Sequence, residues 1–365
     1  MAPQIERRQH KAQTHAPDNR PDADHPDRGR QSHRAFQQWS SICTYVNQGK
    51  IIPIVGPDLG EHIWGSAQDQ ALAIADTSNF PLSPDEKFDL AKVTQYIATT
   101  NSPAYARDQL GKVRFNHFKE RNQAIFAANS PAASPGALLD MVVAARRQDP
   151  TDPYTILADL DARIYISASP DSLLDRFLKA KGKTPNAQYC QWRDNSKSHP
   201  VAPVFEGEPT AAAPYLYYAF GSLANPDSQV ITEDDFFDYL ISTSRFDLMP
   251  TIVSGSMMEN SLLFLGFSLS DWKFRVFFRL LMAFGGRVNM ENFNHVGVQI
   301  DPEDNTLDDV EMAREYLSRY FRRANIDIYW GSSSEFLTEL VAQRKAMPIG
   351  KDEAAARPVD LSAFG

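Results

Sequence analysis

A short apolar segment that runs through a polar turn into an apolar helix is the strongest constraint on the fold. The apolar run of residues 262–265 stops at Gly266, and a second apolar stretch begins at Trp272. The turn between them contains three polar residues, Ser268, Ser270 and Asp271. This pattern predicts a buried parallel strand, a tight turn and a buried helix capped by Ser270 or Asp271. Open α/β folds bind nucleotides at such turns, although an ordinary turn without a ligand has the same local pattern.

Strands and helices are expected to alternate along the chain. The expected strands are 51–55, 163–167, 215–220, 262–266, 296–300 and 326–330. Their alternation with helices predicts an α/β fold with a doubly wound, mainly parallel, Rossmann-like sheet. Glycine stands at the end of three strands, at Gly56, Gly221 and Gly266, where a backbone can approach a ligand closely.

The chain divides into a body and two tails. Residues 1–34 are rich in charge and proline and hold four of the eight histidines, so we predict a disordered tail. Residues 35–346 form the predicted folded domain, and residues 347–365 a second tail. Within the domain, residues 66–160 are predicted to be a helical insertion. Residues 182–214 are rich in Pro, Asn and Ser and are predicted to be irregular.

Composition and charge exclude several classes of protein. The net charge of −9 argues against direct nucleic-acid binding, which needs a basic face. Two cysteines, Cys43 and Cys190, cannot build a disulfide scaffold or a four-cysteine zinc site, and they fit a reducing cytoplasm. No apolar run approaches the roughly 18 residues of a membrane span, and the first residues lack a signal-peptide core. We therefore expect a cytoplasmic protein with no metal site and no membrane contact.

Seven short motifs follow one another across roughly residues 36–345. They are 54–60, 92–96, 165–174, 220–222, 230–235, 265–271 and 328–331. In this order and spacing they resemble the bacterial sirtuin-like domain of antiphage-defence and effector-associated proteins. The resemblance implies an NAD-binding Rossmann domain over residues 35–346 that cleaves the nicotinamide–ribose bond of NAD⁺.

The resemblance also assigns roles to individual residues. The implied catalytic residues are Ser169 and Asp171. The implied NAD-binding residues are Gly56, Pro57, Asp58, Gly60, Gly221, Gly266, Ser268 and Asp271. Three positions depart from the family pattern: Asp58 stands in a turn that usually reads Gly-Ala-Gly-x-Ser, Ser169 replaces an Asn, and Phe220 replaces a frequent His. Asp58 would repel a phosphate, and His62, just past the first turn, is the best substitute among the histidines.

Two sirtuin-like functions remain open at this point, beside that of an unrelated nucleotide-binding enzyme on the same fold. Protein-deacylating sirtuins carry a four-cysteine zinc module, so the resemblance favours an NAD⁺ hydrolase without zinc, acting in bacterial antiphage defence. In that reading Ser169 positions a water and Asp171 stabilises the ribose cation, whereas ordinary turn chemistry would make them a turn residue and a helix N-cap. The alternative is a catalytically degenerate module that binds NAD or ADP-ribose, or that scaffolds a defence complex. In either case we expect control by a protein partner or by self-assembly.

Overall fold

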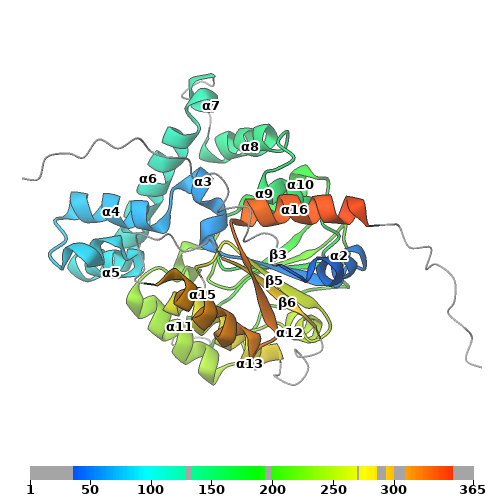
Figure 1. Cartoon of the computed structure of the whole chain (residues 1–365). Helices are drawn as coiled ribbons and strands as arrows, with labels where there is room; N and C mark the ends of the chain where they lie inside the picture. The colour runs from blue at the N-terminus through cyan, green and yellow to red at the C-terminus, as the bar shows by residue number, and fades with distance from the viewer. Residues whose placement is uncertain are drawn as a thin grey trace, which may run out of the picture.

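The computed structural model describes residues 36–128, 134–193, 199–268, 271–285, 293–299 and 309–347. In this part of the chain seven strands form one sheet, in the order β3-β4-β2-β1-β5-β6-β7, and each described pair of neighbours is parallel (Figure 1). The strands are β1 Ile51–Val55, β2 Ile164–Ser167, β3 Asn186–Tyr189, β4 Tyr215–Tyr218, β5 Ser261–Leu265, β6 His295–Gln299 and β7 Ile326–Trp330. The parallel α/β sheet predicted from the sequence is confirmed. The two predicted tails, except Met347, and the predicted cap Ser270 lie outside the described residues.

Strand β3 was missed by the sequence analysis, because it falls in the segment predicted to be irregular. Its residues lack an alternating apolar pattern, and none of its side chains is fully buried. β3 forms at the edge of the sheet by pairing with the buried strand β4, in a register that places Asn186 beside Tyr215. Tertiary pairing therefore outweighs the weak local preference of these residues for a strand.

Helices cover both faces of the sheet, so the predicted doubly wound arrangement is confirmed. One face is covered by α2 Trp39–Asn47, α8 Pro135–Arg146, α9 Pro153–Asp159, α10 Leu173–Ala180 and α16 Ser333–Ala346. The other is covered by α11 Glu233–Arg245, α12 Thr251–Met257, α13 Trp272–Gly285 and α15 Val310–Arg322. Figure 1 shows α8, α9, α10 and α16 above the sheet and α11, α13 and α15 below it. Each face buries its own apolar core. None of the helices in the described ranges combines the length and hydrophobicity that crossing a bilayer requires.

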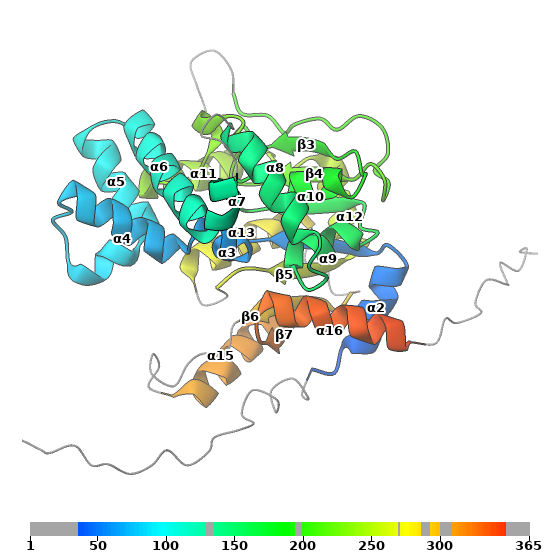
Figure 2. The ribbon, with the colours of Figure 1, turned by 90° about the horizontal axis from the view of Figure 1, so that it is seen from above.

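A group of helices after β1 projects from one end of the sheet (Figure 2). It contains α3 Glu61–Trp64, α4 Ala67–Ser78, α5 Leu90–Thr100, α6 Pro103–Arg121 and α7 Gln123–Ala128, with the short 3₁₀ helices η1 Pro57–Gly60 and η2 Pro84–Phe88. A capping box at Ser66 begins α4, and a small apolar core joins α4, α5 and α6. Thr94 of α5 donates a hydrogen bond to Ile231 O at 2.8 Å, just before α11. This contact holds the helical group against the body of the domain.

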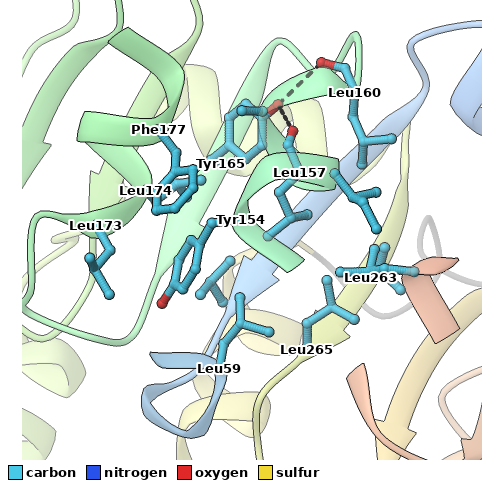
Figure 3. Packing of buried hydrophobic residues seen from close by; sticks show 14 of the residues in the cluster. Leu59, Tyr154, Leu157, Leu160, Tyr165, Leu173, Leu174, Phe177, Leu263 and Leu265 are labelled. Atoms are coloured by element: carbon cyan, nitrogen blue, oxygen red, sulfur yellow. Dashed lines mark hydrogen bonds between the residues drawn. The ribbon is translucent and has the colours of Figure 1, made fainter. Parts of the chain in front are cut away.

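Strand β2 is anchored to α9 by a buried tyrosine (Figure 3). Tyr165 is fully buried, and its hydroxyl lies 2.9 Å from Leu157 O and 3.3 Å from Leu160 O. Leu157 lies in the last turn of α9 and Leu160 follows the helix as its C-cap, so the tyrosine hydroxyl supports the end of this helix, where backbone acceptors lack regular i+4 donors. The tyrosine thus fixes the strand whose end carries Ser169.

Replacing Tyr165 by Phe is expected to lower the free energy of unfolding by about 1–2 kcal/mol, because buried carbonyl oxygens lose their donor. Urea unfolding of both proteins would measure the change. Tyr105→Phe on α6 is the matched control, because Tyr105 is 44% exposed and should leave stability unchanged. Equal effects of the two substitutions would contradict the anchoring role of Tyr165.

Candidate functional site

A cavity of about 350 Å³ opens at the carboxyl ends of the central strands. In the sheet, β2, β4 and β3 lie on one side of β1, and β5, β6 and β7 lie on the other side. The direction of the strand order therefore reverses between β1 and β5, which is where open α/β sheets form ligand-binding crevices. The residues implied by the sequence that line this cavity are Pro57, Asp58, Ser169, Asp171, Ser268 and Asp271.

Ser169 and Asp171 lie side by side in the turn that follows β2. The Ser169 hydroxyl donates a hydrogen bond to Asp171 Oδ2, and the Leu173 backbone N–H donates to Asp171 Oδ1 at 2.8 Å. Both side chains belong to residues that are less than 10% exposed, and both line the cavity. Burial raises the pKa of Asp171, while the hydrogen bond from Ser169 opposes that rise. Asp171 therefore does two things: one of its oxygens accepts a hydrogen bond at the start of α10, and its side chain lines the cavity.

Asp58 occupies the first turn, directly after β1. Its backbone N–H donates to Gly266 O at 3.0 Å, and its side chain lines the cavity. Burial, followed by the negative charges of Glu61 and Asp271, raises the pKa of Asp58 to about 7. The sequence predicts that Asp58 repels a phosphate. With this pKa, the carboxyl group of Asp58 carries its negative charge above neutral pH and loses it below.

The glycines at the ends of β1 and β5 allow the two following turns to pack against each other. A Cβ at Gly56 would lie 2.1 Å from Gly266 O. Gly266 has φ +70°, and a Cβ there would lie 2.4 Å from the backbone nitrogen of Leu59. Contacts within the chain therefore require both glycines, whatever ligand the cavity holds.

The other two glycines implied by the sequence lie outside the cavity lining. Gly60, between η1 and α3, packs near the Tyr154 hydroxyl and Leu173. Gly221, after β4, is close to the backbone of Ser228, which a Cβ would meet at 2.1 Å. The structure therefore brings six of the ten residues implied by the sequence into one cavity, while the glycines shape the turns around it.

Aromatic side chains form one wall of the cavity. They are Phe220, Phe236, Phe267, Phe274 and Phe277. The rings of Phe220 and Phe277 have centroids 5.0 Å apart, and those of Phe267 and Phe274 are 4.9 Å apart. α13 thus contributes its rings to the core and to the cavity, although its first residue, Trp272, is 44% exposed. The cavity is consequently apolar on this side and polar on the side of Ser169 and Asp171.

Sequence analysis missed a polar pair contributed by the projecting helices. Arg114 of α6 lines the cavity, and its Nε donates to Gln70 Oε1 of α4 at 3.0 Å. Gln70 is buried and its amide donates in turn to Gly65 O at 3.0 Å. The sequence offers one indication of this pair: Gln70 is a polar residue on the buried face of α4, next to the apolar Ala71 and Ile74. Arg114 itself carries no recognisable pattern.

A second cavity, of about 310 Å³, lies beside the first and shares Asp58 and Phe267 with it. His62 lines this second cavity, and its Nε2 is 3.6 Å from Asp152 Oδ2. Arg146 Nη1 lies at the same distance from that oxygen, which is buried and has no hydrogen-bond partner. His62 is therefore part of a polar cluster away from Ser169, and among the described residues that line the first cavity there is no histidine.

The described residues contain no cluster of three or more His, Cys, Asp or Glu side chains with the geometry of a metal site. Both cysteines are free and buried. The lining of the first cavity offers carboxylates, hydroxyls, the Gln70 amide, the Arg114 guanidinium, the Lys273 ammonium and an apolar wall.

Comparison with known proteins gives two matches. Residues 163–329, from just before β2 into β7, match the family model described as a SIR2-like domain. The NAD(+) hydrolase ThsA of Acinetobacter baumannii (strain 532279) is 29% identical over 134 residues. The matched segment covers 37% of this chain and 24% of the relative, so it spans about a quarter of the relative's length. The resemblance to a sirtuin-like domain predicted from the sequence is confirmed.

Proposed function

We propose that this chain, which contains a SIR2-like domain, binds NAD⁺ at the edge of its sheet and hydrolyses the nicotinamide–ribose bond. The observation that carries the proposal is the adjacency of Ser169 and Asp171 in a cavity at the reversal point of the strand order. Each of the two cavities has a volume near the lower end of the usual range for ligand sites, about 300–1,000 Å³. Asp58 and Phe267 line both cavities, so the two are adjacent, and the proposal places one half of a dinucleotide in each.

The proposed orientation places the nicotinamide ribose beside Asp171 and the adenosine in the second cavity. The apolar wall of the first cavity suits the nicotinamide ring once it becomes neutral. In the second cavity, Asp152 Oδ2 is a buried acceptor that has Arg146 and His62 at 3.6 Å but no hydrogen bond, and it could accept one from a ribose hydroxyl or from the adenine amine.

The proposed reaction needs no acid, since nicotinamide leaves as a neutral molecule. The bond between C1′ and the ring nitrogen breaks, and its electron pair departs with nicotinamide. In its ionised form, which the hydrogen bonds from Ser169 and Leu173 and the charge of Arg114 favour against burial, the Asp171 carboxylate stabilises the positive charge that develops on the ribose. Water then attacks C1′ and loses a proton, so that NAD⁺ and water give ADP-ribose, nicotinamide and one proton. Ser169 contributes a hydroxyl oxygen near the attacking water, although its hydrogen already bonds to Asp171.

A catalytically degenerate module that binds NAD or ADP-ribose is the second candidate. Two observations favour it: the hydroxyl hydrogen of Ser169 is already engaged, and Phe220 stands where the family often has a histidine. In this case the same cavity would bind the dinucleotide without turning it over. We further propose that either version acts in bacterial antiphage defence, under the control of a protein partner or of self-assembly.

Replacing Ser169 by Asn tests which candidate is correct. The amide restores two donors and an acceptor for a water at a residue that lines the cavity. We expect nicotinamide release to rise about tenfold, which is below the usual contribution of a well-placed group, about 10²–10⁴. Nicotinamide would be followed by chromatography, with Ser169→Ala as the control that lacks the amide. A folded Ser169→Asn protein that binds NAD⁺ without any release would favour the degenerate module.

A further inference from the structure

Arg114 is a half-buried cation that lines the cavity, and its charge interacts with Asp171 only beyond ion-pair distance. Its neighbour, Gln70, is neutral, and no carboxylate in the described ranges lies within ion-pair distance. Lys273, the other cation of the lining, is already paired with Asp89, since Nζ and Oδ1 are 2.8 Å apart. An arginine left in this state favours an anionic ligand, because burying an unpaired charge is costly.

The side chain of Arg114 is held in place before any ligand arrives. Gln70 accepts from its Nε, and the Gln70 amide is fixed by backbone carbonyls at the end of α3, Trp64 O at 3.4 Å and Gly65 O at 3.0 Å. With Nε engaged, the two terminal nitrogens of the guanidinium remain as a pair of donors. Such a pair matches two oxygens of a phosphate.

The position of Arg114 indicates which of the two phosphates of NAD⁺ it would contact. Its charge acts on Asp171, and burial lowers the pKa of Arg114, although an arginine remains charged in proteins. In the proposed function Asp171 faces C1′ of the nicotinamide ribose. The nearest anionic group of the substrate is then the phosphate on the 5′ carbon of that ribose.

We propose that Arg114 is a positioning residue that binds the phosphate attached to the nicotinamide ribose, and thereby distinguishes a nucleotide from a nucleoside. The inference rests on the proposed function, because that function supplies the ligand. It assigns a role in the site to the projecting helices, since Arg114 comes from α6 and its support from α4. Ligands that lack this phosphate should bind without any contribution from Arg114.

Calorimetric titration with three probes tests this inference: NAD⁺, nicotinamide mononucleotide, which keeps the one phosphate, and nicotinamide riboside, which has none. Arg114→Met should weaken binding of the mononucleotide about 10–100-fold, the usual range for a hydrogen bond to a charged group. Binding of the riboside should change less than about twofold, since it makes no such bond. Arg121→Met is the matched control, because Arg121 lies on the same helix and pairs with Asp69 at the surface.

The outcomes separate the inference from the proposed function. If the parent binds NAD⁺ but Arg114→Met binds the mononucleotide equally well, Arg114 has no part in phosphate recognition. An equal loss for the mononucleotide and the riboside would mean that Arg114 only supports Asp171, and would also overturn the inference. A parent that binds none of the three probes contradicts the proposed function itself. Arg114→Lys keeps the charge and should retain a preference for the mononucleotide, which protects the test against misfolding of Arg114→Met.

Discussion

Replacing Asp171 by Asn should lower the rate of nicotinamide release by about 10²–10³-fold, as is typical when a group that stabilises transition-state charge is removed. Asn keeps the shape of the side chain and can still accept from the Leu173 N–H, so α10 should keep its first turn. The loss should therefore appear in turnover, with little change in melting temperature. Release would be measured in the parent and in the more active Ser169→Asn protein.

Asp175→Asn is the control for this substitution. Asp175 lies on α10, pairs with Lys179 and is outside the cavity lining, so its replacement should leave turnover unchanged. Equal turnover of Asp171→Asn and the parent, in both backgrounds, would remove Asp171 from the proposed mechanism.

Replacing Asp58 by Asn should tighten binding of NAD⁺ and ADP-ribose by about tenfold or more at pH 8. The carboxyl of Asp58, with a pKa of about 7, is ionised at this pH and repels the diphosphate of the ligand. Two like charges about 8 Å apart repel by about 2 kcal/mol at an effective dielectric constant of about 20, which is more than tenfold in Kd. At pH 6 Asp58 is mostly neutral, so the parent should bind nearly as well as the variant.

The same substitution should change stability in a pH-dependent way. The raised pKa means that the folded state keeps a proton on Asp58 between about pH 4 and 7, where the unfolded chain has released it. The stability of the parent therefore falls as pH rises through this window, and Asp58→Asn should avoid the loss. The variant should gain at most about 4 kcal/mol at pH 8 and nothing below pH 4.

Urea unfolding across this pH range, with the exposed Asp85→Asn as the control, would measure the difference. An Asp58→Asn protein whose stability and affinity follow the parent at every pH would show that Asp58 is ionised and solvated throughout.

The sequence contained enough information for the central sheet. The strands around Val55, Ser167 and Leu265 are continuous apolar runs, as expected for strands buried on both faces, and each is followed by turn residues. Because the carboxyl ends of parallel strands share one edge, the turn residues Asp58, Ser169 and Asp271 could be placed in one cavity without a structure.

The remaining features depend on contacts that no local pattern encodes. β3 forms because β4 offers an unpaired edge, and its own residues show no strand periodicity. Arg114 enters the site because α6 folds back over the first turn, and its position depends on the packing of α4 against α6. The packing of the adjacent turn against Gly56 and Gly266 could not be read from the sequence, and Gly266 also lines the second cavity. The distance of His62 from Ser169 likewise follows from the path of α3.

Titration of NAD⁺ against a protein whose first cavity is obstructed by a bulky side chain tests the central claim most directly. Gly111 of α6 is an exposed residue of that cavity's lining, and a Cβ there would meet nothing within 4 Å, so Gly111→Trp should place an indole at the rim of the cavity while the fold is kept. Gly255 of α12 has equally open surroundings and is not part of the lining, which makes Gly255→Trp the matched control. We predict that the parent and Gly255→Trp bind NAD⁺ with the same Kd and that Gly111→Trp does not bind it. Unchanged binding by a folded Gly111→Trp protein, or no binding by the parent, would contradict the account.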